Sequence, residues 1–132
     1  MRSIEAAWLE VLPGRRGSSI VADYTFHSCS ALTSITGLEA VTRIGGNAFR
    51  ECTALASVTG LEAVTSIGDS AFRECTALTS VTGLASVTFI DIAAFYGCAA
   101  LASITGLANV SSIGHSAFYG SGLAGDFAWP VG

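Results

Sequence analysis

A repeat of 23 residues constrains the fold of this chain more than any other feature of its sequence. The stretch RIGGNAFRECTALASVTGL at 43–61 recurs with few changes as SIGDSAFRECTALTSVTGL at 66–84. We call the residues at equivalent positions of successive repeats a column. The two most regular columns are Phe26, Phe49, Phe72, Phe95 and Phe118, and Cys29, Cys52, Cys75 and Cys98. So many positions in one register indicate a solenoid, in which stacked repeats bury a core that no single repeat could bury alone.

Each repeat contains signals for one strand, one bend and one short helical turn. LTSVT at 78–82 carries the β-branched residues of a strand, and Gly83 marks the bend after it. DSAFREC at 69–75 begins with helix-capping residues, which predicts one or two helical turns. We call one such unit a coil. The sequence predicts an α/β fold, a right-handed solenoid of about five repeats with a short parallel sheet on one side and an extended return.

The repeat also resembles a known family. The motif I-G-x-x-A-F-x-x-C-x-x-L-x-x-[IV] occurs as IGDSAFRECTALTSV at 67–81, and a related version is IAAFYGCAALASI at 92–104. It resembles the repeat of the BspA-like leucine-rich-repeat family over about residues 18–123. The resemblance implies a solenoid that binds other macromolecules, often as a surface adhesin. The chain departs from the family pattern where Gly-Leu replaces an apolar residue followed by proline, and where Ser121-Gly122 replaces cysteine and its neighbour.

The composition of the chain argues against a membrane span and against a nucleic-acid partner. The chain is 51% hydrophobic and 12% charged, well below the roughly 25% charged residues of an average protein. Its apolar residues are spread at short intervals, so we expect no membrane span, which needs about 18 consecutive apolar residues. A net charge of -4 argues against a nucleic-acid partner. From residue 75 onward the charged residues are Asp91 and Asp126, so the surface there is expected to be uncharged.

The N-terminal stretch MRSIEAAWLEVLPGRRGSS at 1–19 does not have the pattern of a secretion signal. Glu5 and Glu10 interrupt its apolar residues, and no small-residue cleavage site follows. The compartment is therefore open: the protein is expected to be intracellular, or at the cell surface if this chain is a piece of a longer protein.

The four cysteines each stand alone in a coil, one per repeat. A zinc site needs ligands that converge on one point, commonly as close cysteine pairs. Neighbouring coils would bring thiols near disulfide range, but their side chains are expected to point in parallel into the core. We therefore favour buried thiols that fill the same gap in each coil, with disulfides and a metal site as alternatives.

Nothing in the sequence predicts an enzyme or a cofactor. His27 and His115 each precede a serine, but no acidic residue is placed to orient either ring. Phosphate-binding, dinucleotide-binding and metalloprotease motifs are missing from the sequence. Both histidines are expected at the surface.

Two columns of hydroxyl residues should lie on the exposed face of the predicted strands, because residues two apart face the same way. These hydroxyls either bond between neighbouring coils or form a ligand surface, and a regular hydroxyl grid could also bind ice. The candidate binding residues are Ser34, Ser57, Ser80 and Ser103 in one column, and Thr36, Thr59, Thr82 and Thr105 in the other.

A second candidate surface is aromatic. The C-terminal coils carry large apolar residues in columns that hold polar residues elsewhere: Phe89, Ile92, Tyr96 and Tyr119. Exposed apolar patches with tyrosine are typical of interfaces, although such residues can also be scattered or cover a further segment. Arg50-Glu51 and Arg73-Glu74, in adjacent coils, are expected to form cross-coil ion pairs.

The two ends complete the predicted organisation. Residues 1–20 are expected to form an N-terminal cap and a partial first rung through Trp8, Leu9 and Leu12; 21–123 form the repeats, and 124–132 a truncated last rung. Phe127 and Trp129 would leave an open edge able to self-associate. The sequence favours a non-catalytic, adhesin-like module that binds a protein or a surface glycoconjugate. The alternative is a structural spacer in a larger repeat protein.

Overall fold

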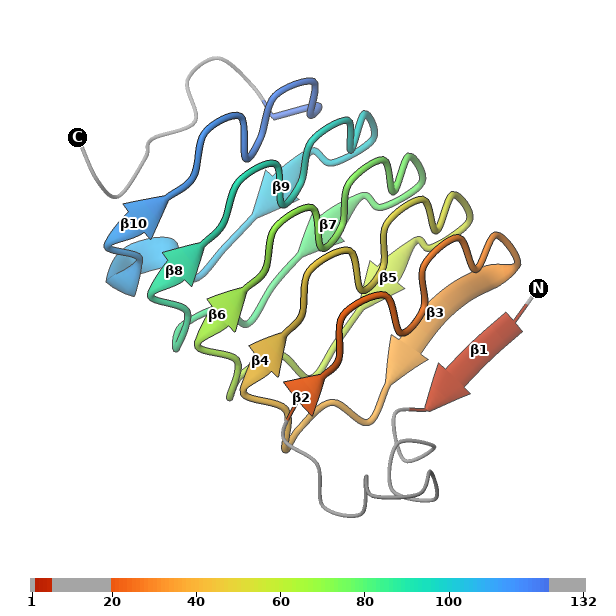
Figure 1. Cartoon of the computed structure of the whole chain (residues 1–132), viewed down its shortest axis with the longest axis horizontal. Helices are drawn as coiled ribbons and strands as arrows, with labels where there is room; N and C mark the ends of the chain where they lie inside the picture. Colours follow the sequence, from red (N-terminus) through yellow and green to blue (C-terminus); the bar gives the residue numbers. More distant parts are fainter. Residues whose placement is uncertain (1, 6–19, 124–132) are drawn as a thin grey trace.

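The computed structural model describes residues 2–5 and 20–123, which wind into a β-solenoid (Figure 1). One face is a five-stranded parallel sheet in the order β10-β8-β6-β4-β2. Its strands are β2 (Ile20–Val21), β4 (Arg43–Ile44), β6 (Ser66–Ile67), β8 (Phe89–Ile90) and β10 (Ser112–Ile113). Neighbouring strands pair column to column, as Ile44 with Ile67 and Ile67 with Ile90. The predicted register of the repeats is therefore confirmed.

A second side of the solenoid carries two smaller parallel sheets (Figure 1). These are β1-β3-β5 and β7-β9, with strands β1 (Arg2–Glu5), β3 (Leu32–Thr36), β5 (Ser57–Val58), β7 (Ser80–Val81) and β9 (Ser103–Ile104). The prediction of a sheet on one side alone was wrong. The return path also pairs between coils, because it carries its own β-branched column of Val21, Ile44, Ile67, Ile90 and Ile113.

The helical turn predicted at 69–75 does not form, and neither do its equivalents in the other coils. In the described residues the one helix is a 3-10 helix, η1 (Leu107–Asn109). The α/β class predicted from the sequence is thus corrected to a β-solenoid with almost no helix.

The backbone hydrogen bonds of segment 69–75 explain this difference. Alternate N–H groups donate to the next coil: Ser70 to Ile92, Phe72 to Ala94 and Glu74 to Tyr96, at N···O distances of 2.9, 2.7 and 2.7 Å. The intervening N–H groups donate to carbonyls three residues earlier in their own coil. An α-helix would direct every N–H four residues back within one segment and leave none for the neighbouring coil. Positive φ at Ser70 (57°) and Glu74 (60°) makes the chain of turns possible.

The interior contains one column of stacked phenylalanine rings. Neighbouring rings from Phe26 to Phe118 lie 5.0 to 5.2 Å apart between centroids, with interplanar angles of 4° to 13°. Phe49, Phe72 and Phe95 have no exposed surface. Burial of each side chain contributes about 1.5–3 kcal/mol. The expected stacking of equivalent side chains in a continuous core is confirmed.

Hydroxyl groups bond between coils in a column that the sequence did not single out. Thr65 donates to the carbonyl of Thr42 at 3.1 Å, Thr88 to that of Thr65 at 3.4 Å, and Ser111 to that of Thr88 at 3.2 Å. These side chains precede the strands of the five-stranded sheet and tie each coil to the one before it.

The predictions for the ends fall mainly outside the described residues. This applies to Trp8, Leu9 and Leu12 of the cap and to Phe127 and Trp129 of the last rung. Within the described part, β1 pairs in parallel with β3 at the N-terminal side of the solenoid.

Candidate functional site

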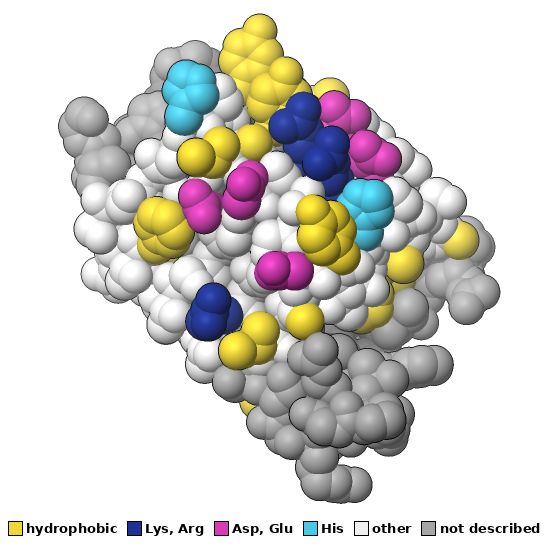
Figure 2. Space-filling view, in the orientation of Figure 1, with side chains coloured by type: hydrophobic (Ala, Val, Ile, Leu, Met, Phe, Trp, Pro, Cys, Tyr) yellow, Lys and Arg dark blue, Asp and Glu magenta, His cyan; other side chains and the backbone are white. Residues whose placement is uncertain are grey.

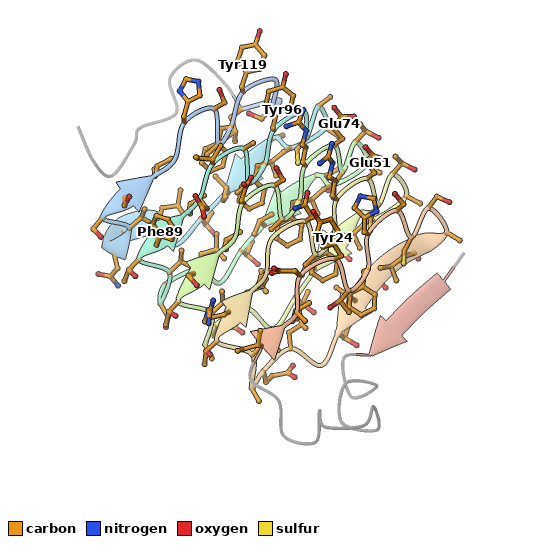
Figure 3. The ribbon with its side chains drawn as sticks, in the orientation of Figure 1. Tyr24, Glu51, Glu74, Phe89, Tyr96 and Tyr119 are labelled. Atoms are coloured by element: carbon orange, nitrogen blue, oxygen red, sulfur yellow. The ribbon has the colours of Figure 1, made fainter. Side chains whose placement is uncertain are left out.

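Two of the predicted aromatic residues lie together on one edge of the solenoid. The rings of Tyr96 and Tyr119 are stacked, with centroids 5.4 Å apart and planes tilted by 30°. The guanidinium carbon of Arg73 lies 4.3 Å from the centroid of the Tyr96 ring, within cation–π range. Tyr119 is 66% exposed. We call Arg73, Tyr96 and Tyr119 the tyrosine edge (Figure 3).

The structure does not bring all four predicted aromatic and apolar residues together. Phe89 lies on β8, well away from the labelled tyrosines in Figure 3, and is 38% exposed. Ile92 follows β8 in the same coil and is 49% exposed. The candidate surface is thus two separate surfaces, because the tyrosines occupy the turn segment and Phe89 the sheet.

The expected cross-coil ion pairs are also corrected. In residues 20–123 the one ion pair joins Arg50 to Glu51 of the same coil, Nε to Oε2 at 3.6 Å. Arg73 lies over Tyr96 instead. Arg50 therefore contacts Glu51 and Asn47 of its own coil, whereas Arg73 contacts the tyrosine of the next coil in its own column.

A shallow groove of about 290 Å³ runs over the outer face of the five-stranded sheet. Its floor contains the glycines that follow β4 and β6, and its walls contain charged residues and one aromatic ring. Acidic, basic and hydrophobic side chains gather on this face in Figure 2. The lining residues are Asp23, Arg43, Ile44, Gly45, Gly46, Ser66, Ile67, Gly68, Asp69, Phe89 and Asp91. We call it the sheet groove.

The two predicted hydroxyl columns lie on the side of the smaller sheets. All four threonines are exposed, at Thr36, Thr59, Thr82 and Thr105. Ser57 and Ser103 are exposed, whereas Ser34 and Ser80 are half-buried. The threonine column is therefore accessible along the solenoid, whereas the serine column is accessible in part.

Sequence reasoning missed Tyr24, which is 60% exposed at the N-terminal end of the repeats. Its ring lies 5.6 Å from that of His27. The signal was available, because Tyr24 stands in the column of Asn47, Ser70, Ala93 and Ser116, where no other aromatic residue occurs.

All four cysteines are free thiols, and three of them are fully buried. Each buried thiol donates to the carbonyl of a phenylalanine in the preceding coil: Cys52 to Phe26, Cys75 to Phe49 and Cys98 to Phe72, at 3.0, 3.1 and 3.0 Å. Burial raises the pKa of Cys52 from its usual 9.0 to about 11 and that of Cys98 to about 12. It raises the pKa of Cys75 still further. No group of three or more potential metal ligands occurs in the part of the chain that the structure describes.

We expect alkylation to separate Cys29 from the other cysteines. Cys29 is partly exposed, so iodoacetamide should modify it in the native protein. At pH 8 the raised pKa of Cys52 leaves this thiol about a hundredfold less ionised than its usual pKa of 9.0 would, and only the thiolate reacts. Mass spectrometry of native protein should therefore find one rapid adduct at Cys29, with the buried thiols reacting after unfolding. Fast modification of Cys75 in the folded protein would contradict this burial.

The sequence also matches a family model. The model describes a BspA type leucine rich repeat region and finds six copies over residues 19–125. The chain belongs to the BspA-type leucine-rich-repeat family. The resemblance inferred from the A-F-x-x-C motif is confirmed. BspA-type repeats are typically non-catalytic, and leucine-rich repeats generally bind proteins.

Solved structures of other leucine-rich-repeat proteins resemble this BspA-type chain. A leucine rich cell surface protein from Faecalibacterium prausnitzii is 32% identical with a TM-score of 0.61, over 80% of this chain and 35% of that one. A leucine-rich repeat protein from Bacteroides ovatus is 26% identical with a TM-score of 0.60, over 74% of this chain and 31% of that one. The T. pallidum leucine rich repeat protein, 24% identical over 73% of this chain and 62% of that one, shares the fold with a TM-score of 0.53.

This BspA-type chain spans about a third of the length of the two bacterial proteins described first. No curated protein matches it in sequence. Within residues 2–5 and 20–123 the structure has no helix of the length and apolar character that crossing a membrane requires.

Proposed function

We propose that this chain is a non-catalytic, adhesin-like protein-binding module whose principal contact is the tyrosine edge. The observation that carries the proposal is the exposure of Tyr119, at 66%, on top of an ordered stack with Tyr96 and Arg73. Tyrosine and arginine are enriched in protein interfaces and, with tryptophan, among the residues whose truncation costs the most binding energy.

The stack also reduces the cost of binding. A side chain that is already held in one position loses less conformational freedom when a partner covers it. Arg73 is held over Tyr96 and Tyr96 against Tyr119, so the edge offers a preorganised surface. Its coils carry few charges, because from residue 75 to 123 the one charged side chain is Asp91. On the Tyr119 side of the edge a partner therefore has little charge to desolvate, and Arg73 is the charged member of the edge.

The hydroxyl columns are proposed as a second, weaker contact surface. Thr59, Thr82 and Thr105 are exposed in neighbouring coils and present a row of hydroxyl groups. Hydroxyl groups can donate and accept hydrogen bonds, which suits a protein or the sugar of a surface glycoconjugate. Cell-surface placement is supported by the likeness to the F. prausnitzii cell surface protein.

The test compares partner capture by the native chain with capture by the Tyr96→Ala/Tyr119→Ala variant. Immobilised protein is exposed to extracellular and membrane protein fractions, and captured proteins are identified and quantified by mass spectrometry. Loss of two interface tyrosines should lower capture of the partner by tenfold or more. Tyr24→Ala removes an exposed tyrosine at the other end of the solenoid and is the matched control.

Thermal unfolding of each variant shows whether the fold is retained. A folded double variant with undiminished capture would exclude the tyrosine edge as the contact. No reproducible partner for the native chain would instead support the structural spacer, in which the repeats separate other parts of a larger protein.

A further inference from the structure

We propose that the end of the sheet groove formed by Phe89, Asp91 and Asp69 binds an arginine side chain presented by an extended basic segment of the partner protein. This inference rests on the proposed function, because it specifies the chemistry of the partner. It concerns a different face from the tyrosine edge, so the two can be tested separately (Figure 3).

Asp91 occupies a column that otherwise holds small residues. The equivalent residues are Ala22, which follows the edge strand β2, and Gly45, Gly68 and Gly114. A Cβ atom at Gly68 would lie 2.8 Å from backbone atoms of Gly45 and Gly46, and one at Gly114 would meet the backbone of Asp91 and Ile92 even more closely. Close stacking on a preceding coil therefore favours glycine at these positions. Asp91 occurs against that preference, so packing does not explain it.

Two further departures from the repeat occur beside Asp91. Phe89 stands in the column of Arg43, Ser66 and Ser112, and Ile92 in that of Gly46, Asp69 and His115. The other coils serve as internal references, because they adopt the same backbone conformation with other residues in these columns. Phe89 and Asp91 both line the groove. A local sequence change that the fold does not require, concentrated around one cavity, is typical of a functional site.

The carboxylates of Asp91 and Asp69 each accept one hydrogen bond through one oxygen. Oδ1 of Asp91 accepts the N–H of Ile92 at 2.7 Å, and Oδ1 of Asp69 accepts the hydroxyl of Ser70 at 2.9 Å. Each carboxylate is thereby oriented by one oxygen. No protein donor to either second oxygen is found in the described residues, which leaves these oxygens for a ligand.

The charged residues that line the groove are mainly acidic. The groove contains the carboxylates of Asp23, Asp69 and Asp91 and the guanidinium of Arg43. Arg43 pairs in register with Ser66, and Ser66 with Phe89, so Arg43 lies two strands away from Phe89. Two strand spacings are about 9.6 Å. The Phe89 end is consequently negative and complementary to a cation.

An arginine side chain fits this end better than other cations. Its planar guanidinium can lie on the face of Phe89 and still donate in the plane to carboxylates at the edge of the ring. It is also weakly hydrated compared with the ammonium group of lysine, so its transfer from water to the groove costs less hydration free energy. An extended segment is the expected carrier, since the groove crosses strands of three successive coils and is shallow.

The test uses two labelled peptides that differ in charge alone. One is a short peptide of alternating glycine and arginine, and its twin carries citrulline, the neutral isostere, in place of arginine. Fluorescence anisotropy at physiological ionic strength measures the affinity of the native chain for each. The arginine peptide should bind about tenfold more tightly or better. Equal binding of the two peptides, or no binding of either, overturns the proposal.

The variants locate the binding site. Asp91→Gly introduces the glycine of the neighbouring coils but removes the acceptor of the Ile92 N–H, so it should fold with at most a small fall in Tm while binding the arginine peptide about three- to fivefold more weakly. Adding Phe89→Ala should bring the loss to about tenfold. Glu39→Gln removes the same charge from an exposed site outside the groove and should change the affinity less than twofold.

Three results would contradict the assignment. They are a loss with Glu39→Gln equal to that with Asp91→Gly, unchanged binding by the double variant, and a marked fall in Tm for Asp91→Gly, which would give Asp91 a structural role. The Tyr96→Ala/Tyr119→Ala variant should still bind the arginine peptide. Failure of the groove and failure of the tyrosine edge are therefore distinguished.

Discussion

Replacing Phe72 with alanine is expected to lower the free energy of unfolding by about 3–5 kcal/mol. Phe72 has no exposed surface and stacks on both sides, against Phe49 at 5.0 Å and Phe95 at 5.2 Å. Truncation removes the buried ring and leaves a cavity in the middle of the phenylalanine column. Because each coil is stabilised by its neighbours, the substitution weakens the packing of this coil against both neighbouring coils.

Urea unfolding followed by circular dichroism measures this change. Phe89→Ala is the matched control, since it removes the same side chain from the exposed face of β8 and should cost much less. Equal losses for Phe72→Ala and Phe89→Ala would contradict the role of the column as the core.

Substitution of Gly68 by alanine is expected to destabilise the protein by about 1–3 kcal/mol, although it adds a single methyl group. The new Cβ would lie 2.8 Å from backbone atoms of the preceding coil, Gly45 C and Gly46 N, which cannot rotate away. The Gly68 N–H donates to the Ile44 carbonyl at 2.8 Å, so separation of the coils would also weaken that bond.

Gly46→Ala gives the control for this prediction. A Cβ there would have its nearest neighbour, the Asp69 carbonyl oxygen, at 3.4 Å, an ordinary contact. Thermal and urea unfolding should show a clear loss for Gly68→Ala and little change for Gly46→Ala. Similar stability of the two variants would show that the glycine column tolerates side chains. It would also mean that close packing does not set Asp91 apart from the glycines of its column.

Sequence reasoning located the core well and the local backbone poorly. Phe49, Leu55 and Ile67 were assigned to buried columns because apolar residues recur at one fixed step, and burial depends on that recurrence. The turn segment at 69–75 was predicted as helical because its residues are compatible with a helix cap and a helical turn. Its true conformation depends on hydrogen bonds to Ile92, Ala94 and Tyr96, which belong to another coil.

The candidate surfaces show the same division. Comparison of columns identified Phe89 and Tyr96 as unusual, because the other residues of each column show which residue type is usual at that position. It could not show that they lie on different faces, because that depends on which segment of the coil pairs as a sheet and which turns. The departure of Asp91 from the glycines of its column is visible in the sequence, but the close packing that makes this departure significant is a distance between neighbouring coils.

The amino-acid sequence by itself determined the register of this protein. A step of 23 residues places like side chains over like, and the family, the buried columns and the exposed hydroxyl columns follow from it. The tertiary structure alone decided the conformation within each coil, the second sheet, the tyrosine edge and the sheet groove. The physical reason is that half of the backbone donors in the turn segment find their acceptors in the next coil, so no coil has a preferred shape until its neighbour is in place.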